Sequence, residues 1–170
     1  MSPPQALRPF LPSDLPRCVA IFRDSIEVLA ADDYDDDQRS AWAASADDAA
    51  AFGANLAGNL TLVATMAGAL VGFASLKDRD TIDMLYVDPP AARRGVGGAL
   101  LDALIRLALA RGGARLTSEV SDVARTLFER HGFVAQKRNL VRKDDQWLAN
   151  TTMTKPLAKP DSAPAKPTQH

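Results

Sequence analysis

The segment Thr81–Leu104, TIDMLYVDPPAARRGVGGALLDAL, restricts the folds open to this chain more than any other stretch. Its β-rich beginning is halted by Asp88 and two prolines, which cannot continue a hydrogen-bonded strand. Three glycines then follow two arginines, and from Gly97 to Arg111 the apolar residues keep helical spacing. The chain must therefore place a strand, a glycine-rich loop and a helix N-terminus in direct succession.

The glycine-rich loop predicts a phosphate site. The first amides of a helix have no intrahelical partner, and glycines let an anion approach them closely. Arg93 and Arg94 add guanidinium groups, whose paired donors suit phosphate oxygens. A turn that only lets the strand and the helix pack is the alternative, but it leaves the paired arginines unexplained. We expect a ligand with at least one phosphate, and by preference a pyrophosphate.

Two common phosphate-binding loops do not fit this segment. A Walker A loop needs Lys-Ser or Lys-Thr after its last glycine, where this chain has Ala99-Leu100. A dinucleotide fingerprint needs a third glycine at the position of Leu100, and it normally lies near the start of a parallel sheet. Nucleotide triphosphate hydrolysis and dinucleotide binding are therefore both disfavoured.

Strand and helix patterns alternate ahead of the loop. Residues 6–16 predict a short strand and the start of a helix, whose spaced apolar residues should form one buried stripe. The Ala- and Asp-rich region after that helix predicts a second helix from about Asp37. Residues 59–78 predict a hairpin that turns at Ala67-Gly68, with Gly68 at positive φ. The stripe consists of Val19, Phe22, Ile26 and Leu29.

The part of the chain after the loop continues the alternation. Residues 114–120 predict a strand, and Ser121 is the expected N-cap of a helix over 122–132. Segments 133–143 and 146–157 predict an antiparallel pair. The order of elements indicates an α/β protein with a mixed sheet covered by helices on both faces. The residues of the last helix that should face inward are Val123, Leu127 and Phe128.

Length and composition fit one cytoplasmic domain. The chain has 170 residues, 46% of them apolar, and its 20 Lys and Arg nearly balance 21 Asp and Glu, so no partnership with nucleic acid or a membrane surface is expected. Its one cysteine, Cys18, is expected in the core. Neither a signal peptide nor a membrane span is recognisable. Residues 1–157 should form the domain, and the Pro-rich residues 158–170 a disordered tail.

Three motifs together resemble the GNAT superfamily of N-acetyltransferases. LYVDPPAARRGVGGALLDALI, over residues 85–105, is similar to its acetyl-CoA-binding signature. VGFASL, over 71–76, looks like its central hairpin strand, and SDVARTLFERHGF, over 121–133, is similar to its N-x-x-A-x-x-L-Y-E-K-x-G-F segment. The resemblance spans about residues 5–157 and is closest to small bacterial members. It implies a single-domain GNAT fold with a mixed, mostly antiparallel sheet of about seven strands.

The resemblance implies acetyl-CoA as co-substrate, with no metal. The pyrophosphate would lie on the loop amides, and the pantetheine would run along the end of the preceding strand, where splayed backbone groups are free to pair with it. Arg93 and Arg94 stand near Ala92, which replaces the family's Gln or Arg ahead of the loop. The expected cofactor-binding residues are Leu85, Tyr86, Val87, Arg93, Arg94, Gly95, Val96, Gly97, Gly98, Ala99, Ser121 and Phe128.

Direct attack by an amine on the thioester is the implied reaction. An amine with a pKa of about 10 must lose a proton first, and a carboxylate is the usual acceptor. The family often has a Glu where this chain has Thr81, so Asp83, two residues further on, is the expected base. Glu119 on the neighbouring strand is the second candidate. An Asp83 that only forms a salt bridge or a cap at a strand edge is the structural alternative.

A second departure concerns the leaving thiolate. The family's frequent Tyr, which protonates the thiolate, is replaced by Phe128, and its frequent Asn is replaced by Ser121. Either Tyr34 or Ser121 donates the proton, or the thiolate leaves without help, which a thiol pKa of about 8.5 makes tolerable.

The acceptor site is expected between the first two helices. The acidic run Asp32–Asp37 would attract a cationic amine, although a solvated loop with Asp37 as helix cap is an equal alternative. Tyr34, Gln38 and Trp42 form a Y-x-x-x-Q-x-x-x-W element that could line the pocket together with Asp83.

These expectations converge on an acetyl-CoA-dependent N-acetyltransferase that acts on a primary amine of a small molecule or peptide, either as a monomer or as a homodimer. A catalytically silent acyl-CoA-binding sensor or interaction module is the alternative, because two family positions with catalytic roles have changed.

Overall fold

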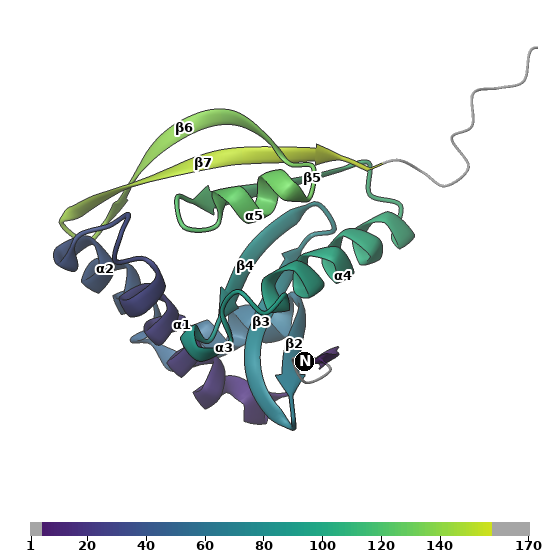
Figure 1. Ribbon diagram of the computed structural model, residues 1–170, viewed down its shortest axis with the longest axis horizontal. Coiled ribbons are helices and arrows are strands. Elements are labelled where there is room, and N and C mark those ends of the chain that lie inside the picture. Colours follow the sequence, from purple (N-terminus) through teal and green to yellow (C-terminus); the bar gives the residue numbers. More distant parts are fainter. Residues whose placement is uncertain (1–4, 158–170) are drawn as a thin grey trace, which may run out of the picture.

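In the part of the chain that the structure describes, seven strands form one sheet in the order β1-β2-β3-β4-β5-β7-β6 (Figure 1). The computed structural model describes residues 5–157, so the expected tail at 158–170 lies outside the described residues. All neighbouring strands are antiparallel except β4 and β5, which confirms the predicted mixed, mostly antiparallel sheet. The strands are β1 (Gln5–Pro9), β2 (Leu60–Met66), β3 (Ala69–Lys77), β4 (Thr81–Val87), β5 (Arg115–Ser121), β6 (Val134–Lys143) and β7 (Gln146–Pro156).

Helices cover both faces of the sheet, as the order of elements predicted. One apolar core lies between the sheet, α4 and α5, and the other between the sheet, α1 and α3. No helix in the described part of the chain is long and apolar enough to cross a membrane. The helices are α1 (Leu15–Leu29), α2 (Asp36–Ala43), α3 (Ala49–Gly58), α4 (Val96–Ala110) and α5 (Arg125–Arg130).

The Ala- and Asp-rich region holds two helices where one was predicted. Asp35, and not Asp37, caps α2: its carboxylate accepts from the backbone N–H of Gln38 at 2.8 Å. Asp48 caps α3 in the same way, accepting from the Ala51 amide at 3.0 Å. The prediction of a single helix was wrong because Asp48 caps a further helix after α2. The alanines of this region fit either face of a helix, so their spacing gave no sign of the interruption.

The buried stripe of α1 is also shifted from the predicted one. Phe22 and Ile26 are buried as expected, but Val19 and Leu29 are only half-buried. Cys18 is fully buried, and burial raises the pKa of its thiol to about 12. The predicted core role of this cysteine is confirmed.

Both predicted hairpins are present. Ala67 and Gly68 join β2 to β3, and both have positive φ, 51° and 82°. At the second hairpin Asp144 has a φ of 52° between β6 and β7. Two-residue turns between right-twisted strands have positive φ either at both central residues, as at Ala67-Gly68, or at the first one alone, as at Asp144.

The sheet opens between β4 and β5. These parallel strands pair only at Thr81 with Thr117 and Ile82 with Ser118, and beyond these pairs they diverge. The pairing of β4 with β3 skips Asp83, so Asp83 is the extra residue of a β-bulge. After the bulge, Tyr86 packs on the side of α1 while the neighbouring apolar residues of β4 pack on the side of α4. The open end of β4 therefore presents one unpaired backbone edge.

Gly72 sets how closely α4 approaches the sheet. A Cβ atom on Gly72 would lie 2.9 Å from Val96 Cγ1 and 3.1 Å from the Tyr86 carbonyl oxygen. Because the carbonyl cannot move aside, we expect Gly72→Ala to destabilise the fold by roughly 1–3 kcal/mol. Denaturant unfolding measures this, with Gly58→Ala as the control, since nothing lies within 4 Å of a Cβ at Gly58. Equal stabilities of the two variants would contradict the tight contact.

Candidate functional site

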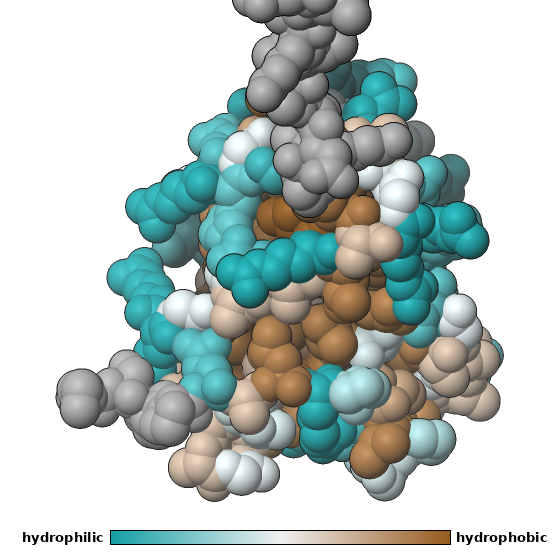
Figure 2. Space-filling view, turned by 90° about the vertical axis from the view of Figure 1, so that its right-hand side faces the viewer, coloured by the Kyte–Doolittle hydropathy of each residue, from teal (hydrophilic) through white to brown (hydrophobic). Residues whose placement is uncertain are grey.

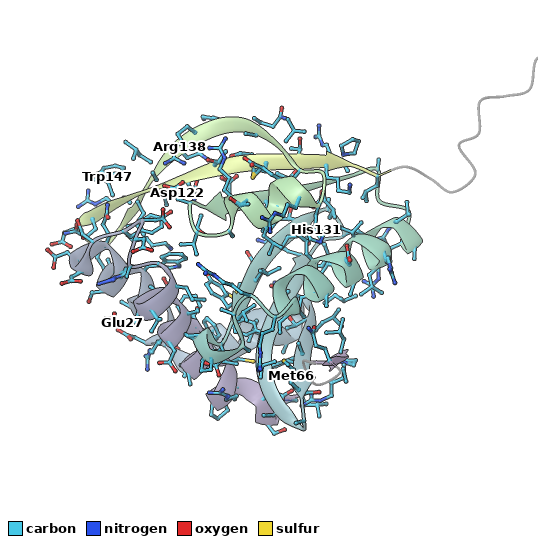
Figure 3. The ribbon with its side chains drawn as sticks, in the orientation of Figure 1. Glu27, Met66, Asp122, His131, Arg138 and Trp147 are labelled. Atoms are coloured by element: carbon cyan, nitrogen blue, oxygen red, sulfur yellow. The ribbon has the colours of Figure 1, made fainter. Side chains whose placement is uncertain are left out.

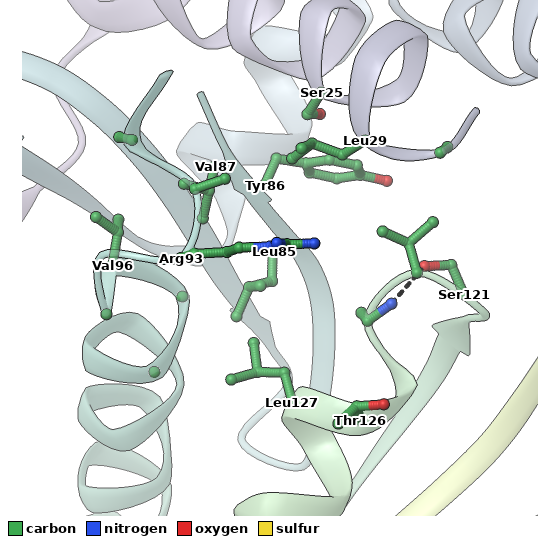
Figure 4. Close-up of a pocket in the computed structure, with 18 of the residues that line it drawn as sticks. Ser25, Leu29, Leu85, Tyr86, Val87, Arg93, Val96, Ser121, Thr126 and Leu127 are labelled. Carbon is green, nitrogen blue, oxygen red and sulfur yellow. Dashed lines mark hydrogen bonds between the residues drawn. The ribbon is translucent and has the colours of Figure 1, made fainter. Parts of the chain in front are cut away.

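A cleft of about 840 Å³ opens where β4 and β5 diverge (Figure 4). Its walls come from five parts of the chain: α1, Trp42 of α2, the end of β4 with the following loop, the N-terminus of α4, and the segment from the end of β5 through α5. Leu85, Tyr86 and Val87 line it from β4, as predicted from the sequence. The divergence of the two strands thus creates the cavity.

The N-terminus of α4 forms one end of the cleft and presents backbone amides there. Gly95 is the N-cap residue with a φ of 83°, and it has no side chain to cap the helix. Ala99 makes the first intrahelical bond, to the Gly95 carbonyl at 3.0 Å, so the preceding amides point outward without an intrahelical acceptor. Gly97 and Gly98 line the cleft and leave these amides accessible. Ala99 itself, predicted to bind the cofactor, does not line the cleft, because its amide is used inside the helix.

Two long-range contacts hold the loop at its ends. At its start, Asp88 accepts from an Arg17 nitrogen at 2.6 Å. At its end, the Arg94 carbonyl accepts from Gln5 Nε2 at 2.8 Å. Arg93, with a φ of 62°, extends its side chain into the cleft (Figure 4), whereas Arg94 does not line it. Only one of the two predicted arginines is therefore brought to the site.

The helix α5 supplies a wall that the sequence interpretation assigned to the core. Leu127 is half-buried: it packs against the core and also lines the cleft, so its predicted inward position is confirmed in part. Val123, just before the helix, is 36% exposed and lines the cleft, so the prediction that it points inward was wrong. Arg130 and His131 line the same wall, and His131 Nδ1 lies 2.9 Å from the Leu127 carbonyl. The helical spacing of these four residues was the sequence signal for a common side of the segment. A cleft wall and a core face have the same spacing, so the signal could not distinguish them.

A smaller cavity of about 70 Å³ lies on the other side of the opening. Asp83 and Glu119 both line it, so the two candidate bases are brought to one cavity. Asp83 accepts from Asn55 Nδ2 at 3.0 Å, and Glu119 accepts from Asn139 Nδ2 at 2.8 Å. Within residues 5–157 no three His, Cys, Asp or Glu side chains come together as a metal site would need.

The two cavities meet in a neck between the diverging strands. Five residues line both of them, and they are Trp42, Leu85, Tyr86, Ser121 and Ala124. A ligand that fills the cleft from the helix N-terminus to these five residues would therefore lie beside the cavity that holds the carboxylates.

Comparison with known proteins identifies the family. Residues 30–157 match the acetyltransferase (GNAT) domain. YafP, an N-acetyltransferase of Escherichia coli (strain K12), is 35% identical over 147 residues, which cover 86% of this chain and 93% of YafP. The chain belongs to the GNAT family of acetyltransferases. It is therefore an acyltransferase by family, as the sequence motifs predicted.

Solved GNAT structures agree with this fold. A GCN5-related N-acetyltransferase from Rhodopseudomonas palustris is 54% identical, has a TM-score of 0.90, and the match covers 92% of this chain and 98% of that one. YncA from Salmonella typhimurium, solved with acetyl-CoA, is 24% identical with a TM-score of 0.64 and coverage of 95% and 99%. The predicted GNAT architecture is confirmed.

Tyr34 has a structural role in the GNAT domain, and it does not line either cavity. Its buried hydroxyl donates to the Ala149 carbonyl at 2.6 Å and accepts from the Asp122 amide at 3.0 Å. Burial raises the pKa of this tyrosine. Because the single hydroxyl proton is already engaged, the structure gives no support to Tyr34 as a proton donor or a substrate contact.

Gln38 is likewise structural. Its Oε1 accepts from the Asp35 amide at 3.0 Å, and its Nε2 donates to the Trp147 carbonyl at 2.8 Å. The aspartates of the acidic run are exposed and line neither cavity. Of the predicted Y-x-x-x-Q-x-x-x-W element, only Trp42 reaches the neck.

Two predicted cofactor residues lie at the far side of the opening. Ser121 lines both cavities, and its Oγ accepts from the Ala124 amide at 3.3 Å (Figure 4). Phe128 lines only the smaller cavity and packs edge-on against Phe133 at a centroid distance of 4.9 Å. Its ring is buried, which fits a packing role.

Asp122 and Arg138 brace the β5–α5 turn that borders the cleft (Figure 3). Two nitrogens of Arg138 donate to the Asp122 carboxylate at 2.5 and 2.8 Å, and these bonds hold the pKa of Asp122 below its usual range. A lowered pKa in the folded state stabilises the protein above the unfolded pKa, and the gain is lost as pH falls through the folded value. We expect Asp122→Asn to lose stability at neutral pH, and the difference from wild type to shrink below about pH 4. Urea midpoints across pH measure this, and a difference that stays constant with pH would contradict it.

Proposed function

We propose that the protein is an acetyl-CoA-dependent N-acetyltransferase that moves an acetyl group directly to a primary amine of a small molecule or peptide. The observation that carries the proposal is the neck, because it connects an anion-binding helix N-terminus to a cavity that holds two carboxylates. A pyrophosphate on the amides of α4 would let the pantetheine follow the unpaired edge of β4. The residues that would hold it are Leu85, Tyr86, Val87, Arg93, Gly95, Val96, Gly97, Gly98 and Ser121.

The proposed position of acetyl-CoA, the acetyl donor, is supported by the residues that line the cleft. The cleft has a volume of about 840 Å³, and the residues that line it include the cations Arg93 and Arg130 as well as Tyr86 and Trp42 of the neck. YncA, with the same fold, was solved with acetyl-CoA. The thioester would supply an activated acetyl group, and the chain would position it at the neck.

The proposed position of the amine acceptor is supported by the two carboxylates of the smaller cavity. An incoming ammonium group must lose a proton, and Asp83, with Glu119 as the second candidate, would accept it directly or through water. The exposed position of Asp83 at the bulge leaves room for an amine. This arrangement favours catalysis over a silent acyl-CoA-binding module.

The experiment is a mass-spectrometric screen for acetylated products in amine pools incubated with the protein and acetyl-CoA, followed by thiol release with each hit. We expect thiol release that depends on the amine. Tight acetyl-CoA binding without amine-dependent thiol release would overturn the enzymatic proposal and leave the silent module. Stabilisation by ATP or NAD in place of acetyl-CoA would contradict the assignment of the loop.

A further inference from the structure

Tyr86 stands in the neck, where the two cavities meet. The five neck residues include only three with a side-chain hydrogen-bond donor: Trp42, Tyr86 and Ser121. Tyr86 belongs to the open end of β4, beyond the bulge at Asp83, and its ring turns towards α1. Figure 4 shows the ring below Leu29 and Ser25 of α1, with the hydroxyl directed into the cleft.

The ring of Tyr86 is held by three aromatic neighbours. Its centroid lies 4.7 Å from Phe22, 5.7 Å from Phe73 and 6.3 Å from Trp42. Two of these contacts are edge-to-face, an arrangement that stabilises aromatic pairs beyond the burial of area. A donor fixed in this way needs no reorganisation when charge develops beside it.

Neither the other tyrosine nor Phe128 can supply this donor. Tyr34, the only other tyrosine of the chain, already donates its proton to the Ala149 carbonyl. Phe128 has no hydroxyl. Ser121 and Trp42 are the other two donors of the neck. The Ser121 oxygen accepts from the Ala124 amide at 3.3 Å, which holds it at the turn but leaves its proton free, so Ser121 and Trp42 are both tested below.

We propose that the Tyr86 hydroxyl donates a hydrogen bond to the thioester sulfur as the acetyl group is transferred, and so stabilises the leaving thiolate. The inference rests on the proposed function and adds a catalytic residue to it. In that reaction the amine nitrogen forms a bond to the acetyl carbon, the carbon–sulfur bond breaks, and the sulfur keeps the electron pair. The nitrogen loses its proton to a carboxylate or water, and the sulfur can take one later from solvent, so Tyr86 keeps its own proton.

The state of the phenol agrees with a donor that is not itself consumed. Burial raises the pKa of Tyr86 well above its usual range, and an interaction with the Trp42 side chain opposes that rise only in part. The phenol therefore stays protonated over the whole working range of pH. A phenol of such high pKa stabilises a thiolate by hydrogen bonding more readily than by full proton transfer.

The test is Tyr86→Phe, which removes one oxygen and keeps the packed ring. We expect kcat to fall by about 100-fold while KM for acetyl-CoA changes by about twofold or less, because the bond forms only as charge develops. A second readout uses free CoA: the ultraviolet absorbance of its thiolate gives the thiol pKa in the complex. That pKa should be lower with wild type than with the variant, and a purely structural role would not produce this difference.

Two further variants separate Tyr86 from its neighbours. Tyr34→Phe, the matched change at the other tyrosine, should lower thermal stability and leave the pKa of the bound CoA thiol as in wild type. Ser121→Ala should also leave that pKa unchanged, and a rise with Ser121→Ala but not with Tyr86→Phe would move the role to Ser121 and overturn the inference. Trp42→Phe, which removes the indole donor beside the phenol, should raise the thiol pKa in part, and it serves as the second test if Tyr86→Phe folds poorly.

The outcomes distinguish a failure of the Tyr86 inference from a failure of the proposed function. If wild type binds CoA and turns over acetyl-CoA, but Tyr86→Phe matches it in kcat and thiol pKa, the inference fails and the proposed function stands. If wild type does not bind CoA at all, the proposed function fails and the inference fails with it.

Discussion

Gly97→Val is expected to raise the dissociation constant for CoA by at least about 100-fold, which is about 2.7 kcal/mol of binding free energy. Gly97 lies in the first turn of α4 and lines the cleft. A Cβ there would already lie 3.0 Å from Leu127 Cδ2 and 3.7 Å from Val87 Cγ2. The two further methyl carbons of valine must therefore project into the space through which a phosphate reaches the amides.

Calorimetric titration of CoA measures the effect, and a melting curve checks that the fold is retained. Gly58→Val is the matched control, because Gly58 is also helical and nothing lies within 4 Å of a Cβ at that position. Gly97→Ala should fall between wild type and Gly97→Val. An unchanged CoA affinity in the folded valine variant would refute the placement of the pyrophosphate on this helix.

Asp83→Asn is expected to lower kcat by about 100-fold or more, the contribution typical of a general base. The amide oxygen of asparagine can still accept from Asn55, so the bulge and the contact with α3 should survive. CoA affinity should stay close to that of wild type, because Asp83 lines the smaller cavity and not the cleft.

The pH–rate profile decides between Asp83 and Glu119. Loss of the acid limb in Asp83→Asn, with the limb retained in Glu119→Gln, would assign the base to Asp83. The reverse pattern would assign it to Glu119, whose carboxylate is already bonded to Asn139 and Thr152. A wild-type profile in Asp83→Asn would reduce Asp83 to a structural role at the strand edge.

The cofactor end of the site could be predicted from the sequence because local rules fix it. Two prolines stop a strand, glycines free the amides of a helix start, and both features lie within one short segment. Ser121 and Trp42, predicted to contact the cofactor and the acceptor, both line the opening, and their contacts with those ligands remain predictions.

The acceptor end could not be predicted because tertiary contacts decide it. The polar groups of Tyr34 and Gln38 could either line a pocket or bind the backbone of another element. Only the position of β7 shows that they bind its backbone. The bulge at Asp83 has no glycine or other local signal, yet it directs Tyr86 towards α1. Val123 and Leu127 follow the spacing of a core face, but the divergence of β4 from β5 leaves them on a cleft wall.

The short parallel junction between β4 and β5 also has a consequence for how the folded chain opens. On either side of its two register pairs, strands β1 to β4 and strands β5 to β7 form antiparallel blocks with their own pairings. Within the sheet only these two pairs join the blocks, so fewer hydrogen bonds hold this seam than hold the antiparallel pairs on either side. We therefore expect the sheet to open locally at the seam, which is also the mouth of the site. Ligand that bridges the seam would slow its reopening, so occupancy of the cleft and the lifetime of the folded state are linked.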